Sequence, residues 1–303
     1  MAEKINAGDS GRITREYMDS LLVEMRHIDS VQPSTELTLY GEKFATPVMF
    51  AALSHLNKVH PEGMVEAARG VRDAGAVMWA GMGENDELEA ICATGAKTIK
   101  IIKTYEDNNE IFRRIECAEK CGCLAVGMDV DHAFGSQNHR GDILGLKMAQ
   151  KSLDDIRMFV KSTKLPFVIK GVLSEIDAQK CLDAGVQGIV VSHHHGLVDY
   201  ALPPLQILPR IAKVIKKQIP IFVDCEISRG MDVFKAIALG ATAASAGRAT
   251  MGPLGDSGAE GVKKLFDTMT NELNWAMCVT NSPSLDRIDP AIIWSKTSSG
   301  PLL

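Results

Sequence analysis

Eight short apolar segments are spaced along the chain, and amphipathic segments separate them. Each apolar segment is continuous, which is typical of parallel strands that are buried on both faces. These segments span residues 47–52, 76–81, 98–102, 124–130, 166–170, 187–192, 220–225 and 242–247. The pattern therefore predicts eight strands in one parallel sheet.

The segments between the predicted strands are expected to be helices, because their apolar residues recur at positions i, i+3, i+4 and i+7. The clearest examples span residues 62–75, 110–122, 174–185 and 231–240. Three of these end in Ala-Gly or Leu-Gly just before the next strand, as helix C-termini often do. Ser174 begins one of them with a side chain suited to capping.

Eight strands that alternate with helices predict the α/β class and a (β/α)8 TIM barrel. A doubly wound open sheet is the alternative, but the number of strands and their even spacing favour the barrel. No segment rich in proline, glycine or serine divides the chain, so we predict one barrel domain over residues 47–303 after an N-terminal extension over residues 1–46. A helix is expected near residues 13–27. The longest connection, residues 132–152, is a candidate lid.

Charge and composition weigh against several classes of protein. The net charge is −5 and aromatic residues make up 5% of the chain, whereas nucleic-acid-binding proteins usually carry a basic surface. The N-terminus lacks the apolar core of a signal peptide, and no apolar run reaches the roughly 18 residues of a membrane helix. We therefore expect no nucleic-acid or membrane partner, and a small molecule as the substrate.

The seven cysteines are an odd number in a long chain, which indicates reduced thiols and a cytoplasmic location. Cys117, Cys121 and Cys123 lie close together in the sequence. A zinc or iron–sulfur site usually needs four ligands, and no fourth ligand is evident near these three. We therefore expect no metal site.

Ionisable side chains follow several of the predicted strands. The carboxyl ends of barrel strands carry the active site in TIM-barrel enzymes. These positions hold Lys103, Asp129, Asp131, His132, Lys170, Ser192, His193, His194, His195, Asp224, Cys225, Glu226, Gly247 and Arg248. Their convergence on one face of the barrel predicts an active site there.

The three consecutive histidines admit more than one interpretation. A metal site is one, but neighbouring strand residues point to opposite faces, so either His193 with His195, or His194 alone, points inward. An inward histidine beside a carboxylate is typical of an acid/base pair, because the carboxylate orients the imidazole and stabilises its charged form. A buried histidine with a purely structural role is the remaining alternative.

Lys170 ends an apolar strand, where a lysine is rarely buried unless it is paired or functional. It suits either a Schiff base or a contact with an anionic cofactor. Arg229, Gly230, Gly247 and Arg248 follow the last two strands, where TIM barrels often bind a phosphate through backbone N–H groups and arginine. These residues predict a ligand that bears a phosphate.

Four segments resemble the FMN-dependent α-hydroxy-acid oxidase and dehydrogenase family. That family typically shows a Lys-Gly strand end and then Ser-Asn-His-Gly-Gly; here Lys170 and Gly171 are followed by Ser-His-His-His-Gly at residues 192–196. Residues 220–249 are similar to the FMN-phosphate region of the family, and residues 125–135 to its fourth strand. SLDRID at residues 284–289 is also similar.

The resemblance implies an FMN cofactor and a role for each matching residue. His194 matches the catalytic base, Asp131 its carboxylate partner, and Lys170 the lysine that contacts the flavin and stabilises negative charge on its reduced form. Lys103 and Arg140, with His194, stand where a substrate is expected. The other cofactor-binding residues implied are Ala52, Asp129, Ser192, Asp224, Ser228, Arg229, Gly247 and Arg248. Related proteins often form tetramers, so a homo-oligomer is expected.

Several departures from the family pattern concern the substrate. Leu197 stands where an arginine usually clamps the substrate carboxylate, Lys103 replaces a tyrosine, and only Arg140 lies close to the place of a second arginine. Cys225 and Glu226 replace a pair of glycines. Because each charge-assisted hydrogen bond is worth about 1.5–3 kcal/mol, these losses put the substrate class in more doubt than the cofactor.

The sequence favours an FMN-dependent oxidoreductase that oxidises a 2-hydroxy acid or a related alcohol, with His194 and Asp131 as the base. One alternative is a flavoenzyme of the same family with a substrate that lacks a carboxylate, or with isomerase chemistry. A second is a flavin-free aldolase that forms a Schiff base at Lys170. A third is a barrel that binds or scaffolds without catalysis.

Overall fold

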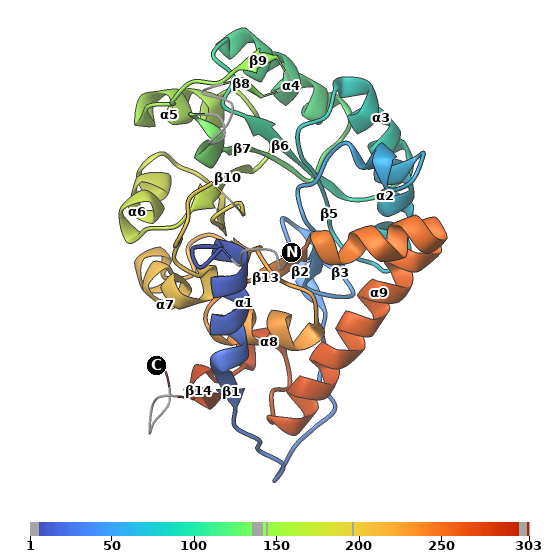
Figure 1. Cartoon of the computed structure of the whole chain (residues 1–303), viewed down its shortest axis with the longest axis vertical. Helices are drawn as coiled ribbons and strands as arrows, with labels where there is room; N and C mark the ends of the chain where they lie inside the picture. Colours follow the sequence, from blue (N-terminus) through green and yellow to red (C-terminus); the bar gives the residue numbers. More distant parts are fainter. Residues whose placement is uncertain (1–5, 135–141, 144, 196, 297–301, 303) are drawn as a thin grey trace.

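Eight parallel strands form a closed barrel in the computed structural model, which describes residues 6–134, 142–143, 145–195, 197–296 and 302 (Figure 1). The strand order is β4-β13-β12-β11-β10-β7-β6-β5, and the backbone N–H of Phe50 donates to the carbonyl of Val77 to join the two ends of the sheet. The predicted TIM barrel is confirmed. Its strands are β4 (Val48–Phe50), β5 (Met78–Ala80), β6 (Thr98–Lys103), β7 (Ala125–Asp129), β10 (Phe167–Val172), β11 (Gly188–Val191), β12 (Ile221–Val223) and β13 (Ala243–Ala246).

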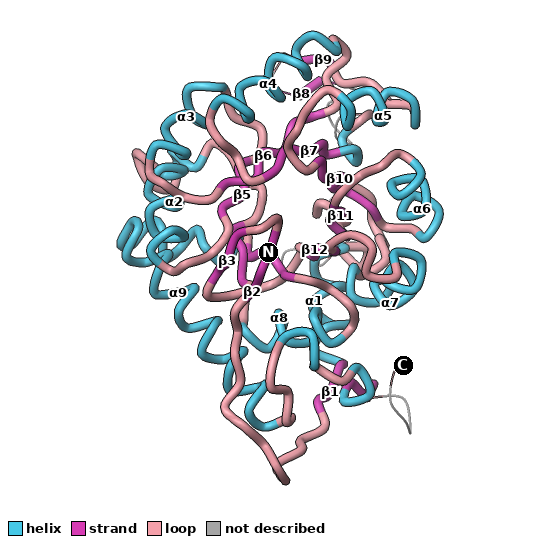
Figure 2. Tube along the Cα trace, turned by 180° about the vertical axis from the view of Figure 1, so that it is seen from behind, coloured by secondary structure: helices cyan, strands magenta, loops and turns pink. Residues whose placement is uncertain are grey.

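A helix follows each barrel strand and packs on the outside of the ring (Figure 2). The predicted cap is present, because the Ser174 side chain accepts a hydrogen bond from the backbone N–H of Asp177. The long last helix contacts both α2 and α8. The outer helices are α2 (Gly63–Asp73), α3 (Asn85–Ala93), α4 (Asn108–Lys120), α5 (Leu153–Lys161), α6 (Glu175–Asp183), α7 (Pro204–Ile215), α8 (Gly230–Ala238) and α9 (Met251–Val279).

The chain before the barrel differs from the expectation of one helix near residues 13–27. Helix α1 (Ser10–Ser20) begins earlier, because the Asp9 side chain accepts hydrogen bonds from two backbone N–H groups of its first turn. It ends at Ser20, and β1 (Leu21–Val23) then pairs antiparallel with β14 (Ile293–Ser295). The expected helix is therefore wrong in its bounds, because a strand partner far along the chain extends the backbone after Ser20.

A β-hairpin closes the barrel at the end where its strands begin. Strands β2 (Leu37–Leu39) and β3 (Glu42–Phe44) are joined by a tight turn, and the hydroxyl of Tyr40 in that turn donates to the carbonyl of Gln187, just before β11. Apolar side chains of the hairpin join the core inside the barrel, which includes Trp79 and Phe222. The described residues therefore fill this end of the barrel, and the cavity lies at the opposite end, where the strands finish.

The connection after β7, the predicted lid, is described only in part. It contains the short strands β8 (Asp142–Ile143) and β9 (Leu146–Lys147), while residues 135–141 and 144 lie outside the described residues. Arg140, a predicted substrate contact, is among the latter. The lid and the role of Arg140 stay predictions.

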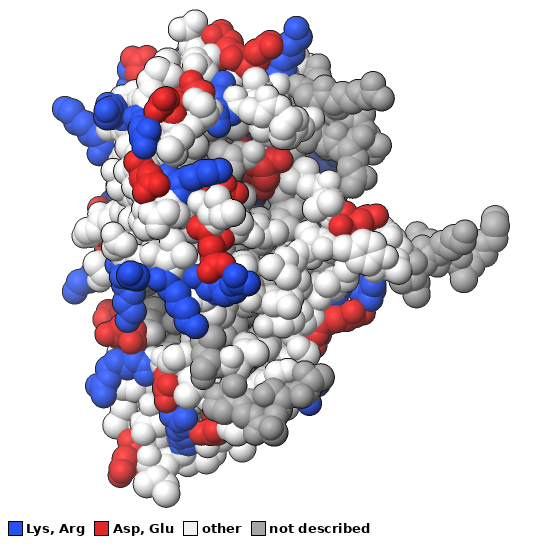
Figure 3. Space-filling model, turned by 90° about the vertical axis from the view of Figure 1, so that its left-hand side faces the viewer, with Lys and Arg blue, Asp and Glu red and all other residues white. Residues whose placement is uncertain are grey.

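Acidic and basic side chains are interspersed on the face formed by α5, α6 and α7 (Figure 3). Within the described residues, no helix combines the length and the apolar character that a membrane crossing needs. All seven cysteines are free thiols.

Candidate active site

A cavity opens at the carboxyl ends of the barrel strands, where the active site was expected. The loops after β4, β12 and β13 and the end of β10 supply most of its wall. The predicted residues that line it are Ala52, Lys170, His194, Asp224, Ser228, Gly247 and Arg248. The structure thus gathers residues from five parts of the barrel around one space.

A row of alternating charges lies directly beneath this cavity. Lys103 on β6 pairs in register with Asp129 on β7, which pairs in register with Lys170 on β10. Side chains at paired positions of parallel strands lie side by side, so the two ammonium groups flank one carboxylate. Lys103 Nζ lies 2.6 Å from Asp129 Oδ2, and Lys170 Nζ lies 3.6 Å from Asp129 Oδ1. All three side chains are buried.

His194 lies above this row and faces a second carboxylate. Its Nδ1 atom lies 3.0 Å from Asp131 Oδ1 and 3.3 Å from Asp129 Oδ2. Lys170 Nζ is 2.9 Å from the same nitrogen. Two carboxylates beside Nδ1 favour a proton on that atom, which leaves Nε2 as the basic nitrogen. The predicted association of His194, Asp131 and Lys170 is therefore present in the geometry.

The charges of this cluster reinforce one another. Burial opposes the charge on Asp129, but His194, Lys103 and Lys170 hold the pKa of Asp129 well below its usual range. Likewise, burial opposes the charge on His194, and the carboxylates of Asp129 and Asp131 more than offset it, so the pKa of His194 is raised. Asp129 is thus ionised at neutral pH.

Lys170 is unsuited to a Schiff base. Burial alone lowers the pKa of a lysine, but Asp129, Asp224 and Asp131 surround its ammonium and raise the pKa above its ordinary value. A Schiff-base lysine must be unprotonated to attack a carbonyl. The charge environment of Lys170 therefore argues against the flavin-free aldolase.

His132 belongs to the cluster, although the motif comparison did not single it out as a site residue. Its Nδ1 atom lies 3.0 Å from Asp131 Oδ1 and 3.0 Å from Lys103 Nζ. Lys103 is consequently turned toward Asp129 and His132, and it is not among the residues that line the cavity. The adjacent Asp-His pair after the fourth barrel strand was the available signal for His132.

The loops after β12 and β13 form the other end of the cavity. Gly247 precedes the short helix η3 (Arg248–Thr250), and Arg248 forms an ion pair with Glu226. Burial and the Arg248 guanidinium lower the pKa of His195 to about 4, so its ring is neutral at pH 7. This end offers the Arg248 guanidinium and the backbone of Gly247 to an anion, and the Glu226 carboxylate already contacts the guanidinium.

The Arg229 side chain is not among the residues that line the cavity. Its guanidinium lies 2.8 Å from Asp19 on α1 and 3.4 Å from Asp232 on α8. Ser228, which lines the cavity, is held by hydrogen bonds from its backbone N–H and its hydroxyl to the Asp232 carboxylate. The structure therefore corrects the predicted placement of Arg229, because two acidic residues draw it to the outside of the barrel.

Ser192 and Asp224 complete the wall behind Lys170. Ser192 Oγ lies 3.4 Å from Lys170 Nζ, and Asp224 Oδ2 lies 3.6 Å from the same atom. Burial opposes ionisation of Asp224, yet Lys170 lowers its pKa below the ordinary value. Their place beside Lys170 is compatible with the predicted cofactor contacts, which stay predictions for each residue.

Comparison with known proteins decides the family. The model of the FMN-dependent dehydrogenase family matches residues 2–152 and 143–295. The chain belongs to the FMN-dependent dehydrogenase family. The predicted family, the FMN cofactor and the oxidoreductase class are thereby confirmed.

Proteins named as oxidases are among the relatives of this chain. The chain is 29% identical to 4-hydroxymandelate oxidase of Amycolatopsis orientalis, over 85% of this chain and 82% of that protein. It is 27% identical to glycolate oxidase of Spinacia oleracea, over 93% of this chain and 86% of that protein. A solved mandelate oxidase variant carrying an FMN adduct superposes with a TM-score of 0.87 at 27% identity, covering 96% of this chain and 93% of the other.

The donors of the cavity fit the FMN of this family. Lys170 places a buried ammonium at one end, which suits negative charge on a reduced flavin. Arg248 and the backbone of Gly247 lie at the other end, which suits a phosphate. Ala51, Ala52 and Leu53 line the same cavity with apolar side chains. The pairing of Arg248 with Glu226 means that a phosphate shares this guanidinium with a carboxylate.

Proposed function

We propose that this protein oxidises a 2-hydroxy acid or a related alcohol with FMN as the electron acceptor. The observation that carries the proposal is the arrangement of His194, Asp131 and Lys170 at the cavity. His194 Nδ1 is 3.0 Å from Asp131, and its ring reaches the cavity that Lys170 also lines. A base, its orienting carboxylate and a fixed positive charge are the groups that oxidation of an alcohol carbon requires.

Each of these residues has one task in the proposed reaction. FMN, when bound, supplies a two-electron acceptor for the hydride that leaves the substrate carbon. Nε2 of His194 takes the proton of the substrate hydroxyl. Asp131 keeps the other ring nitrogen protonated and stabilises the imidazolium that results. Lys170 provides positive charge beside the cofactor site, and Asp129 and Asp224 keep its amine protonated.

The substrate end carries little free positive charge in the described part of the chain. Among the residues that line the cavity, the lysine and arginine side chains are Lys170 and Arg248, and each faces carboxylates. Lys103, the other expected contact, is paired with Asp129. This pairing favours a second candidate, in which the substrate is an alcohol without a carboxylate.

Anaerobic flavin reduction tests both candidates. The holoenzyme is mixed with glycolate, lactate, mandelate and benzyl alcohol, the last being mandelate without its carboxylate, and the loss of flavin absorbance is followed. We expect reduction by at least one 2-hydroxy acid, and a fall of about 10²–10⁴-fold in its rate in His194→Ala. Reduction by benzyl alcohol but not by mandelate would select the second candidate. Unchanged reduction by His194→Ala would disprove the role of His194.

The cytoplasmic location and the homo-oligomer are part of the same proposal. Seven free thiols are consistent with a reducing compartment. A relative with 28% identity is named as a peroxisomal (S)-2-hydroxyacid oxidase of Arabidopsis thaliana, and peroxisomes are the alternative location. Imaging of the tagged protein in its own cell tests the cytoplasmic location. The mass of the protein in solution tests the homo-oligomer.

A further inference from the structure

Four of the seven cysteines gather at the end of the barrel where the strands begin, opposite the cavity. Cys92 lies in the last turn of α3, Cys117 lies in α4, Cys121 follows α4 directly, and Cys123 lies two residues before β7. The sulfur of Cys92 is 3.8 Å from that of Cys123, and the sulfur of Cys117 is 3.9 Å from that of Cys121. The proposed oxidation of the substrate uses none of these thiols.

Cys92 and Cys123 belong to separate elements that their contact brings together. A hydrogen bond between the two thiols spans 3.8 Å, although 31 positions separate the residues in the chain. A disulfide bond is about 2.0 Å long, so its formation requires the two sulfurs to approach by about 1.8 Å. The bond would close a loop over 31 positions, whereas one between Cys117 and Cys121 would close a loop over 4. Because a longer loop constrains the unfolded chain more, the Cys92–Cys123 bond is the more stabilising.

Cys92 is the thiol of this pair that solvent reaches and that ionises more readily. Its side chain is partly exposed, whereas Cys123 is buried. A hydrogen bond from the Cys123 thiol lowers the pKa of Cys92 to about 7, against the opposing effect of burial. The same hydrogen bond raises the pKa of Cys123, which keeps its proton. About half of the Cys92 side chains are therefore thiolates at pH 7, and the thiolate is the reactive form.

We propose that Cys92 and Cys123 form a redox-active pair, which hydrogen peroxide oxidises to a disulfide bond. Cysteines that react with peroxide in a regulated way are accessible, ionise readily and lie beside a second thiol, and Cys92 meets these three conditions. In a reducing compartment such disulfides are transient, which is compatible with seven free thiols in the structure. The inference is independent of the proposed substrate oxidation, because the pair lies at the opposite end of the barrel.

The proposed reaction with peroxide takes two steps. The Cys92 thiolate attacks one oxygen of hydrogen peroxide, the O–O bond breaks, and hydroxide leaves while the sulfur becomes a sulfenic acid. The Cys123 sulfur then attacks the Cys92 sulfur, the S–O bond breaks, and the oxygen leaves as water with the proton of the Cys123 thiol. The hydroxide combines with the proton that Cys92 released when it ionised. The two thiols thus lose two electrons, and the peroxide that accepts them becomes two molecules of water.

The second pair of thiols is less suited to this reaction. Cys121 is partly exposed, but burial and the neighbouring Cys117 raise the pKa of Cys121 to about 12, so it is a thiol at neutral pH. Cys117 is buried and lies one helical turn away. We therefore expect both to stay reduced when Cys92 and Cys123 react.

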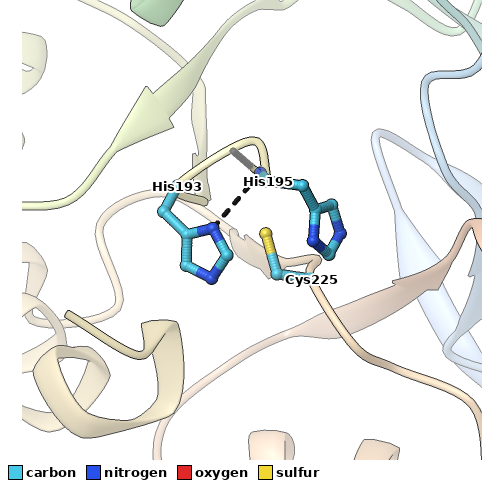
Figure 4. A group of neighbouring side chains, drawn as sticks. All are labelled: His193, His195 and Cys225. Atoms are coloured by element: carbon cyan, nitrogen blue, oxygen red, sulfur yellow. Dashed lines mark hydrogen bonds between the residues drawn. The ribbon is translucent and has the colours of Figure 1, made fainter. Parts of the chain in front are cut away.

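The other three cysteines have no second sulfur within hydrogen-bond distance in the described part of the chain. Cys225 lies beside the cavity, with its sulfur between the imidazole rings of His193 and His195 (Figure 4). Its thiol is buried and donates to Asp224 Oδ1 at 3.0 Å. Burial and the Asp224 carboxylate raise the pKa of Cys225, so it is a poor nucleophile at neutral pH. Cys278 on α9 is partly exposed, like Cys92, and serves as its control.

Treatment of the holoenzyme with hydrogen peroxide, after removal of reductant, tests the proposal. Thiols are counted in denaturant before and after treatment, blocked by alkylation, and the protein is digested with trypsin without reduction. We expect the loss of two of the seven thiols, and their return on addition of dithiothreitol. Trypsin places Cys92 on residues 73–97, Cys117 on residues 115–120, and Cys121 with Cys123 on residues 121–140. Mass spectrometry should find residues 73–97 linked to residues 121–140, and fragmentation should locate the bond at Cys123.

Two results for the unaltered protein would overturn the proposal. One is the retention of all seven thiols after peroxide treatment. The other is a disulfide bond at a different place, either from Cys92 to Cys121 or between residues 115–120 and residues 121–140. Neither result depends on a variant.

Variants separate the tasks of the two thiols. Cys123→Ser keeps a hydroxyl that can donate to Cys92 but has no sulfur to displace the oxygen, so the sulfenic acid of Cys92 should accumulate and react with dimedone. Cys92→Ser should give neither the disulfide nor the dimedone adduct at this pair. Cys278→Ser, the matched control, should form the Cys92–Cys123 bond as the unaltered protein does. Failure of Cys278→Ser to form the bond, or absence of the adduct from folded Cys123→Ser, would overturn the assignment.

Discussion

The carboxylate of Glu226 and the guanidinium of Arg248 form an ion pair that bridges the loops after β12 and β13. The pair sits at the end of the cavity that suits a phosphate, so FMN must compete with Glu226 for Arg248. We expect Glu226→Gln to lower the dissociation constant of FMN by about tenfold, which corresponds to about 1.4 kcal/mol. Titration of the flavin-free protein, followed by quenching of flavin fluorescence, measures this change.

Riboflavin is the control for this substitution, because it has the same ring but no phosphate. Its affinity should be the same for Glu226→Gln and for the unaltered protein. An equal gain for both flavins would mean that Glu226 acts on the ring or on the fold, and not on the phosphate.

Asp131 is predicted to act through His194. Asp131→Asn removes the charge that keeps Nδ1 of His194 protonated while preserving the size of the side chain. The rate of flavin reduction by substrate should fall by about 10²–10³-fold, with little change in substrate affinity. Asp154→Asn, an exposed change on α5, should leave the rate unaltered. A large effect on affinity with an unchanged rate would contradict the orienting role.

Gly171 is predicted to keep Asp131 in place. It has a φ of +96°, and a Cβ atom there would lie 2.7 Å from Asp131 Oδ2. Gly171→Ala should therefore displace the Asp131 carboxylate from His194 and slow flavin reduction, in addition to a loss of stability of about 1–2 kcal/mol from the backbone conformation.

Gly185 provides the matched control for this change. It also has a positive φ, +77°, but the nearest atom to an added Cβ is Val160 Cγ1 at 3.9 Å, far from the cavity residues. Gly185→Ala should lose similar stability and keep the rate of flavin reduction. Flavin reduction and thermal unfolding are measured for both variants. Equal rates of flavin reduction in Gly171→Ala and Gly185→Ala would show that Gly171 does not position Asp131.

Asp232 is predicted to stabilise the fold in a pH-dependent manner. It is fully buried on α8 and accepts hydrogen bonds from Arg15 of α1 at 2.9 and 3.0 Å. Burial opposes its ionisation, but Arg15 and the backbone N–H of Ser228 lower the pKa of Asp232. Asp232→Asn breaks a buried ion pair, and we expect it to lower the free energy of unfolding by about 3–5 kcal/mol at pH 7.

The sign of the pH effect follows from the lowered pKa. A carboxylate whose pKa is lower in the folded state contributes its full stability above the pKa of the unfolded chain, about 3.9, and loses it as the pH falls through the folded value. The difference in the free energy of unfolding between Asp232→Asn and the unaltered protein should therefore become smaller below about pH 4. Urea unfolding from pH 7 to pH 3 measures this, and a constant difference would show that the charge of Asp232 is not responsible.

The barrel could be predicted from the sequence because its strands are buried on both faces. A continuous apolar run such as residues 220–225 needs no knowledge of its partners to be recognised as a strand. The end of α1 could not be predicted in the same way. The segment after Ser20 is extended because β14, which lies far along the chain, pairs with it, and no local pattern reveals that partner.

The sequence could predict which residues gather at the candidate site, because the carboxyl ends of the barrel strands converge there. It could not predict which of these residues contact one another. Lys170, His194 and Asp131 were expected to converge because each ends or follows a barrel strand, and the family resemblance implied their roles. Which ion pair a charged residue forms depends, however, on the direction of its side chain. In the structure Arg229 pairs with Asp19, and Lys103 pairs with Asp129. The meeting of Cys225 with the two outer histidines likewise requires the spacing of two loops, which sequence alone does not give.

The pairing of β1 with β14 also sets an order of events during synthesis. Val23 pairs with Ile293, which leaves the ribosome 270 residues later. At roughly 5–20 residues per second, the N-terminal strand waits roughly 15–50 s for its partner. During this interval β1, which follows α1, is not yet paired with β14. Helix α1 carries Thr14, which contacts His193 in the folded protein. The mouth of the barrel is therefore completed only after nearly the whole chain has been translated.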